Sequence, residues 1–318
     1  MSGPLDSKLV KLIRGWALRF PSRATLASFD RRSVDRIEQH DDEIVIVIVH
    51  FRATDWCLAT AQALLASSGV RAKVFVVDNG GSTDLETRLP EVVTFVRNET
   101  NLGYTGGANV VLRDWLARRS GEYVIVACHD LGLAPNAVLE MISVLAQDGR
   151  VGIVGPNRAH AKEPRDAPAT RINVRPQRWL SGTCLVFRRE CLQDIGLLDE
   201  AFGSYVEDVD ICFRAWDHGW AVVSCDDVIV ATRGSSSPKD RLIAKNSVLL
   251  AAKRRGLAGA AVEMLLQGLA SALYVLSYVI HARDPKRRRE SASGARLRLS
   301  GLKDGAREAL RSRGGASI

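Results

Sequence analysis

Residues 44–50 read IVIVIVH, an unbroken run of β-branched side chains that ends at a histidine. A strand with one face in water alternates apolar and polar residues, whereas a parallel strand covered by helices on both faces is continuously apolar. The run therefore predicts a buried parallel strand. Together with the alternating helices and strands that follow it in the sequence, it decides the fold class.

Helical and extended patterns alternate after this run. The predicted strands lie at 72–77, 92–96, 123–127, 151–154 and 180–187, the predicted helices at 54–67, 110–118 and from 207 to 219, and a polar loop at 157–178. Such alternation predicts an α/β fold: a Rossmann-like, mostly parallel mixed sheet with helices on both faces.

Polar side chains come directly after three of the predicted strands. They are His50 and Arg52, Asp78 and Asn79, and His129 and Asp130. In doubly wound sheets, ligands bind outside the carboxyl ends of the strands. The sequence therefore predicts one binding site at this edge of the sheet.

Composition and charge limit the class of protein. With 46% hydrophobic residues in 318, the chain can bury a large core, which excludes global disorder. Residues 283–318 carry 11 Lys and Arg against 4 Asp and Glu, so most of the net charge of +8 belongs to this tail. The six cysteines show no zinc-type spacing, and no secretory leader is evident, which favours a cytoplasmic protein.

Several short segments together resemble a known family, the family 2 inverting glycosyltransferases of GT-A fold, and in particular their rhamnosyltransferase-like branch. In order, the segments are VVDNGGSTD at 76–84, NLGYTGGAN at 101–109, SGTC at 181–184, LDEAF at 198–202 and EDVDICFR at 207–214. The resemblance covers roughly residues 44–255. We accordingly divide the chain into an N-terminal basic helix and linker (1–40), a GT-A domain (41–235) and a C-terminal helical, basic region (236–318).

The resemblance implies a glycosyltransferase of the EC 2.4 class. It would move a sugar, for example a deoxyhexose such as rhamnose, from a UDP- or dTDP-sugar to a hydroxyl of a lipid-linked glycan or small molecule. Polysaccharide or natural-product biosynthesis would be its setting. The alternative is a catalytically silent protein that keeps the nucleotide-sugar pocket.

We expect the residues that bind the sugar donor to lie at the strand ends and in the glycine-rich segment. We expect the glycine-rich segment to be a loop. These residues are His50, Arg52, Asp78, Asn79, Asn101, Gly103, Gly107, Asn109, His129, Asp130 and Arg233. The resemblance gives Asp78 a role in binding the base or ribose. Its structural alternative is an Asx turn, because Asp-Asn-Gly-Gly is also a strong turn signal.

The Glu-Asp pair of the last segment carries the implied catalytic role. Inverting transfer needs a carboxylate that accepts the proton of the acceptor hydroxyl. The resemblance assigns this role to Asp208, with Glu207 as the alternative, although acidic residues also favour a helix start without any function. Trp179, Ser181, Gly182 and Thr183 are expected on the acceptor side.

A divalent ion, Mg²⁺ or Mn²⁺, is the implied cofactor, with Asp130 as its ligand. The chain departs from the family pattern at Cys128, which stands where the first motif residue would be and is a poor Mg²⁺ ligand. Arg233 is the alternative partner of the diphosphate, because a guanidinium can neutralise it without a metal.

Residues 257–280 hold a single charged residue, Glu263, and basic clusters flank them. A membrane span, a helix lying on the membrane, a homodimer contact and ordinary core all remain open for this segment. We expect peripheral attachment to the anionic inner face of the cell membrane. Nucleic acid is not an expected partner, because the basic tail lacks interleaved aromatic residues.

Overall fold

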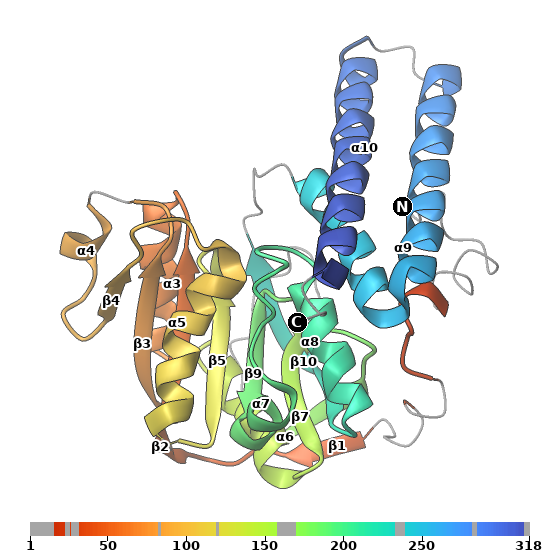
Figure 1. Cartoon of the computed structure of the whole chain (residues 1–318). Helices are drawn as coiled ribbons and strands as arrows, with labels where there is room; N and C mark the ends of the chain where they lie inside the picture. The colour runs from red at the N-terminus through yellow and green to blue at the C-terminus, as the bar shows by residue number, and fades with distance from the viewer. Residues whose placement is uncertain are drawn as a thin grey trace. The chain divides into compact units, whose positions relative to one another are not determined.

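The computed structural model describes residues 16–22, 26, 32–81, 84–118, 121–157, 170–232, 239–281 and 285–314. Two compact units make up the chain. Residues 21–203 and 207–234 form an α/β unit, and residues 1–20, 204–206 and 235–318 form a helical unit (Figure 1). Arg233 lies outside the described residues.

A ten-stranded mixed sheet is the centre of the α/β unit, with strand order β1-β8-β10-β7-β9-β5-β2-β3-β4 and β6 paired with β10. The strands are β1 Arg32–Asp35, β2 His40–His50, β3 Val70–Asp78, β4 Thr94–Arg97, β5 Tyr123–Cys128, β6 Leu131–Leu133, β7 Val151–Asn157, β8 Arg171–Pro176, β9 Cys184–Arg188 and β10 Ala221–Thr232. The helices of this unit are α3 Thr54–Leu65, α4 Leu85–Arg88, α5 Gly103–Arg118, α6 Ala137–Gln147, α7 Arg189–Ile195 and α8 Glu207–Asp217.

The apolar run at 44–49 forms the interior of β2, as predicted. β2 pairs in parallel with β3 on one side and β5 on the other, and α3 and α5 both contact it. The two helices cover opposite faces of the sheet (Figure 1). Ile44, Ile46, Val47 and Ile48 are consequently fully buried, which explains why the strand has no polar alternation.

The glycine-rich segment is helical, so the predicted loop over it is wrong. α5 begins at Gly103, seven residues before the predicted start, because the glycines permit close packing rather than a turn. A Cβ on Gly103 would lie 2.6 Å from the Gly203 carbonyl oxygen, and a Cβ on Gly107 would lie 2.6 Å from Asn79 Nδ2. The missing side chains let α5 approach its neighbours closely.

Four strands, β1, β6, β8 and β10, were not predicted from the sequence. Residues 32–35, predicted as linker, form β1, which pairs antiparallel with β8 inside the stretch predicted as a polar loop. β8 in turn pairs antiparallel with β10. β1 and β8 are short and carry few apolar residues, so their periodicity is weak.

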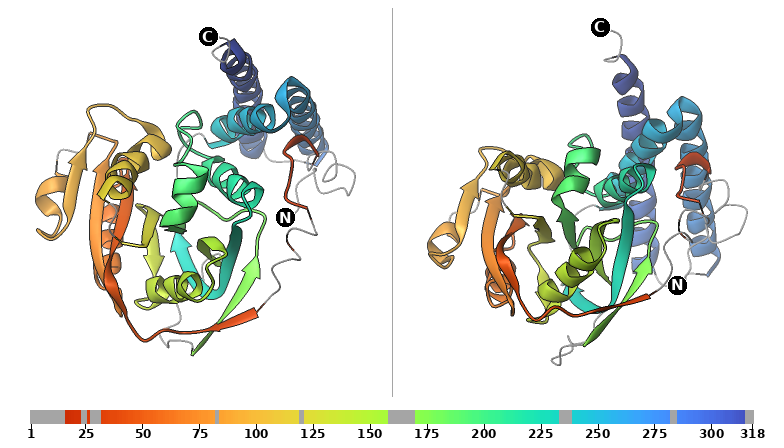
Figure 2. Two further views of the ribbon diagram at one scale, coloured as in Figure 1. Left: turned by 60° about the horizontal axis from the view of Figure 1, so that its bottom comes forward. Right: turned by 90° about the horizontal axis from the view of Figure 1, so that it is seen from below.

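The helical unit contains the long helices α9 (Lys239–His281) and α10 (Pro285–Gly314), which lie side by side (Figures 1 and 2). Gly256, with φ of +63°, breaks α9 into two helical parts. Ala244, Val248 and Ala260 of α9 pack against Leu302 and Ala309 of α10. Within the described residues, no helix has the combination of length and apolarity needed to cross a bilayer.

Candidate active site

The strand register brings the predicted polar residues to one edge of the sheet. His50 is paired with Asp78 at the ends of β2 and β3, and Val49 is paired with Cys128 at the end of β5. β9 runs antiparallel to β5, with Ala127 opposite Cys184, so the segment 181–183 arrives at the same edge. Because neighbouring strands are about 4.8 Å apart, the row from β9 to β3 extends over roughly 14 Å.

Asp78 is fully buried at the β3 end of this row. Its Oδ1 accepts hydrogen bonds from the Gly80 N–H (2.9 Å) and from His50 Nδ1 (3.0 Å). The Ala53 N–H donates to His50 Nε2 (3.2 Å), which places the imidazole proton on Nδ1. The Asx turn is therefore present, and the role of Asp78 in nucleotide binding stays a prediction.

Asn79 ties this turn to the start of α5. Its Nδ2 donates to the Gly103 carbonyl (2.6 Å), and its Oδ1 accepts from Asn98 Nδ2 (2.6 Å). The exposed Asn101 accepts the Gly103 N–H through Oδ1 (2.8 Å) and so caps the first turn of the helix. The buried Asn79 thus connects the turn after β3 to the start of α5, whereas the exposed Asn101 is accessible to a ligand.

Asn109 lies further along α5 and contacts the LDEAF segment. It is buried, and its Nδ2 donates to the Leu198 carbonyl (2.7 Å) and to Glu200 Oε1 (2.9 Å). These bonds fasten α5 to the LDEAF segment. The structure therefore gives this predicted donor-binding residue a structural position.

Cys128, His129 and Asp130 lie at the end of β5, in the middle of the row, and each is partly exposed. Burial lowers the pKa of His129, whose Nδ1 lies 3.2 Å from the Val49 carbonyl oxygen. Burial also raises the pKa of the Cys128 thiol, with further contributions from the charges of Asp130 and Glu207. Cys128 consequently stays a thiol at neutral pH, while Asp130 offers a carboxylate.

The segment 181–183 packs directly against the start of α8. The Gly182 N–H donates to Asp208 Oδ2 (2.8 Å), and the Val209 N–H donates to Asp208 Oδ1 (2.9 Å). Hydrogen bonds from backbone N–H groups favour the ionised form of a carboxyl group. Asp208 is partly exposed, so its carboxyl group lies at the edge of the sheet.

Glu207 is the opposite case. It is buried, and among the described residues its Oε2 has no hydrogen-bond partner. Burial, and then the neighbouring charge of Asp208, raise the pKa of Glu207 well above its ordinary value. The two adjacent carboxyl groups therefore differ in exposure and in hydrogen bonding.

The remaining predicted residues lie around this row. Ser181 and Thr183 bond each other through their hydroxyls (2.8 Å) and are partly exposed. Trp179 is 39% exposed, so it is not a core residue. Arg52 is exposed, adopts a φ of +59° and stacks its guanidinium on the Phe51 ring at 4.8 Å.

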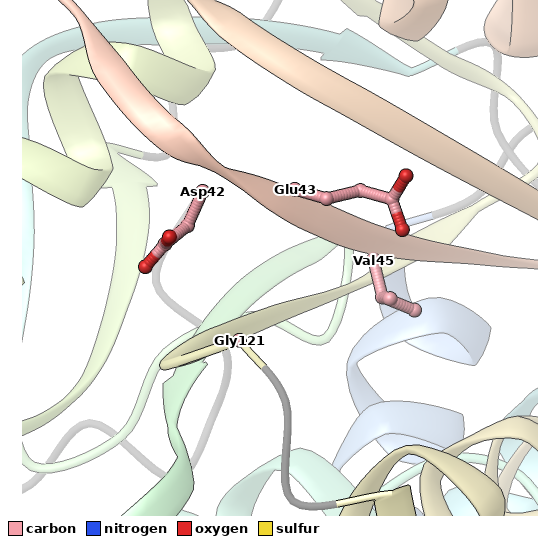
Figure 3. Close-up of a pocket in the computed structure, with 4 residues that line it drawn as sticks. All are labelled: Asp42, Glu43, Val45 and Gly121. Carbon is pink, nitrogen blue, oxygen red and sulfur yellow. The ribbon is translucent and has the colours of Figure 1, made fainter.

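A shallow pocket lined by Asp42, Glu43, Val45 and Gly121 lies elsewhere (Figure 3). Glu43 is near the amino end of β2, and Gly121 precedes β5. The pocket is therefore at the opposite ends of the strands from the row that holds Asp78, Asp130 and Asp208.

Comparison with known proteins shows which enzymes the chain is similar to. The family described as "Glycosyltransferase like family 2" matches residues 165–247, which include the SGTC, LDEAF and EDVDICFR segments. The chain is a glycosyltransferase, and over this stretch it is similar to glycosyltransferases of family 2.

Two relatives of this glycosyltransferase are similar over long stretches. The low-salt glycan biosynthesis hexosyltransferase Agl10 of Haloferax volcanii is 25% identical over 240 residues, 65% of this chain and 76% of that protein. The N-acetylglucosaminyl-diphospho-decaprenol L-rhamnosyltransferase of Mycobacterium tuberculosis is 28% identical over 194 residues. That alignment covers 47% of this chain and 62% of the relative.

The fold of the glycosyltransferase is also that of a solved structure. Mannosyltransferase PcManGT from Pyrobaculum calidifontis, in complex with GDP-Man and Mn²⁺, superposes with a TM-score of 0.58. The superposition covers 98% of both chains at 16% identity, which supports the predicted GT-A fold.

Tyr104 is the site residue of the glycosyltransferase that the sequence did not single out. Its hydroxyl donates to the Gly182 carbonyl (2.9 Å), so it links the start of α5 to the segment beside Asp208. The only sequence signal for a role of Tyr104 was its position within the NLGYTGGAN segment. That position does not distinguish a functional tyrosine from any other aromatic residue.

Proposed function

We propose that the enzyme transfers a hexose or deoxyhexose, such as rhamnose, from a UDP- or dTDP-sugar to a hydroxyl of a lipid-linked glycan, with inversion. The observation that carries this proposal is the pair at the start of α8. Asp208 is partly exposed and accepts two backbone N–H groups, whereas the adjacent Glu207 is buried with a raised pKa. A partly exposed carboxyl group beside a buried one with a raised pKa suits a proton-accepting site.

Asp208 is the proposed catalytic base, because it is partly exposed whereas the alternative, Glu207, is buried. As the acceptor oxygen forms its bond to the anomeric carbon, the bond from that carbon to the diphosphate oxygen breaks. The hydroxyl proton passes to Asp208. The acceptor would then approach along the segment 181–183 and the exposed Trp179.

Asp130 is the proposed ligand of a divalent metal. Among the described residues, no group of three or more His, Cys, Asp and Glu side chains could by itself hold a metal ion. Mg²⁺ fits such a site, because it commonly binds one or two carboxylates together with substrate phosphates. The metal would stabilise the departing diphosphate, and Asp130 would hold it beside the end of β5.

The donor is proposed to lie along the row from β3 to β9. Its nucleoside would meet the turn after Asp78 together with Asn101, and its diphosphate would lie near His129 and Asp130. Both curated relatives carry sugar-transfer names, and the decaprenol rhamnosyltransferase name supports a lipid-linked acceptor and rhamnose.

A nucleotide-sugar panel tests this proposal. UDP-, dTDP- and GDP-sugars should be compared by thermal stabilisation, since a ligand that binds only the native state raises Tm. The stabilising donor is then used for transfer with wild type and Asp208→Asn. We expect Asp208→Asn to lower kcat about 10²- to 10⁴-fold while donor affinity stays near wild type. Unchanged turnover would remove Asp208 from the mechanism.

The helical unit is proposed to dock on an anionic membrane. Between 257 and 272 the exposed residues of α9 are all apolar, namely Leu257, Ala258, Ala261, Leu265, Leu269 and Ala272. Leu265 and Leu269 are 74% and 54% exposed. A helix face of this kind buries its side chains in lipid or in a partner.

Charge favours lipid as the occupant of this face. On α10 the described exposed residues repeat on one side of the helix and, apart from Ser300, are leucines and cations: Arg296, Leu299, Lys303, Arg307, Leu310 and Arg311. Leucines among lysines and arginines are typical of helices lying in a membrane interface. Each cation near anionic lipid adds about 1 kcal/mol to binding.

Vesicle sedimentation tests the membrane proposal. The full chain should bind vesicles rich in phosphatidylglycerol and dissociate as salt rises, and Leu265→Asp with Leu269→Asp should weaken binding at least tenfold. Val92→Asp is the matched control, because Val92 is 70% exposed in the α/β unit. Equal binding of the double variant, or a dimer in solution that hides these leucines, would contradict lipid docking.

A further inference from the structure

Gly182 is the residue at which three parts of the site meet. Its N–H donates to Asp208 Oδ2 (2.8 Å), and its carbonyl oxygen accepts from the Tyr104 hydroxyl (2.9 Å) and the Cys128 thiol (Sγ···O 3.6 Å). Tyr104 belongs to α5 and Cys128 to β5, while Asp208 belongs to α8. One backbone residue therefore connects the donor side of the site to the proposed base.

A glycine at this place has two consequences. A Cβ on Gly182 would lie 3.3 Å from Asp208 Cβ, so a larger residue would crowd the carboxylate. Glycine also rotates freely about its backbone bonds, so its N–H would aim loosely at Asp208 without a restraint. The two donors at its carbonyl supply that restraint.

The Tyr104 hydroxyl is the stronger of these restraints. Burial raises the pKa of Tyr104 well above its ordinary value, and Cys128 and Glu207 act in the same direction. The hydroxyl hence remains a donor at neutral pH. The thiol of Cys128 is a weak donor at a longer distance, so its contribution is smaller.

We propose that Tyr104 is a positioning residue, whose hydroxyl holds Gly182 and thereby fixes the orientation of the Asp208 carboxylate for proton transfer. The inference rests on the proposed role of Asp208. It also gives a reason for a cysteine at position 128, where the family pattern has an acidic residue. The Cys128 thiol donates to the Gly182 carbonyl, whereas an acidic residue would bind a metal.

Tyr104→Phe tests the proposal, because it removes only the hydroxyl. We expect kcat to fall about five- to tenfold, the effect of one lost hydrogen bond on a transition state. The Kd for the donor should change less than twofold. Tyr123→Phe is the matched control: Tyr123 is buried at the far end of β5, and its loss of a hydroxyl should leave kcat unchanged.

Cys128 supplies a second variant pair if Tyr104→Phe does not fold. Cys128→Ala should lower kcat about two- to threefold, and Cys128→Ser, which keeps a donor, should restore it. A wild-type kcat in Tyr104→Phe, or a donor Kd raised as much as kcat falls, would overturn the positioning role. A wild-type chain that transfers no sugar at all would instead contradict the proposed function.

Discussion

Glu207 and Asp208 are neighbours in the first turn of α8, but only Asp208 reaches the edge of the sheet. Glu207 is 7% exposed, and burial raises the pKa of its carboxyl group well above the ordinary value. Asp208 accepts the Gly182 and Val209 N–H groups and is partly exposed. Two residues of similar chemistry are thus placed in different surroundings by position alone.

Glu207→Gln should keep activity and change the pH dependence of stability. The folded pKa of Glu207 is raised, so its contribution is fully present below the unfolded value of about 4.5 and is lost as pH rises through the folded value. Glutamine imitates the neutral acid and cannot ionise. The free energy of unfolding of the variant should therefore exceed that of wild type increasingly from about pH 4.5 upward.

Urea unfolding from pH 4 to 8 measures this difference. A constant difference between the two proteins across that range would show that Glu207 is ionised in the native state. A loss of transfer comparable to that of Asp208→Asn would show that Glu207, not Asp208, accepts the proton.

Removal of divalent metal should abolish transfer if Asp130 holds the ion with the diphosphate. We expect activity to disappear in chelator and to return with Mg²⁺ or Mn²⁺, because the leaving diphosphate loses its charge partner. Asp130→Ala should remove the effect of metal on nucleotide affinity, measured by calorimetry. Full activity in chelator would favour Arg233 as the partner of the diphosphate.

Asp78→Ala should destabilise the α/β unit by about 2 kcal/mol, because it leaves the Gly80 N–H and His50 Nδ1–H without their buried acceptor. Asp78→Asn keeps an acceptor oxygen and should cost less. If Asp78 also binds the nucleoside, Asp78→Asn should raise the Kd for the donor while the free energy of unfolding stays close to that of wild type. A donor Kd equal to that of wild type would restrict Asp78 to the turn.

Gly107→Ala should destabilise the protein although alanine favours helices. The added Cβ would meet Asn79 Nδ2 at 2.6 Å and Val49 Cγ1 at 3.0 Å. Overpacking of this kind costs about 1–3 kcal/mol, which exceeds the helical gain of about 1 kcal/mol. Gly268→Ala in α9 is the control: nothing lies within 4 Å of its Cβ position, and it should be neutral or stabilising by thermal denaturation. Equal shifts in Tm would contradict the steric argument.

Local sequence determined those helices and strands whose residue types fit only one pattern of burial. The run at 44–49 specified a doubly covered parallel strand, because six successive β-branched residues fit no half-exposed position. The apolar spacing of Cys212, Phe213 and Trp216 likewise specified α8, whose buried face these residues form. Polar residues after strands specified the edge of the sheet at which they gather.

Tertiary structure decided what depends on contacts distant in the chain. The glycine-rich segment is a helix because Gly103 meets Gly203 and Gly107 meets Asn79, and no local pattern records those partners. Asn109 turned inward because Leu198 and Glu200 supply its acceptors. The difference between Glu207 and Asp208 also arises only after folding, since desolvation is a property of the packed surroundings and not of the residue type.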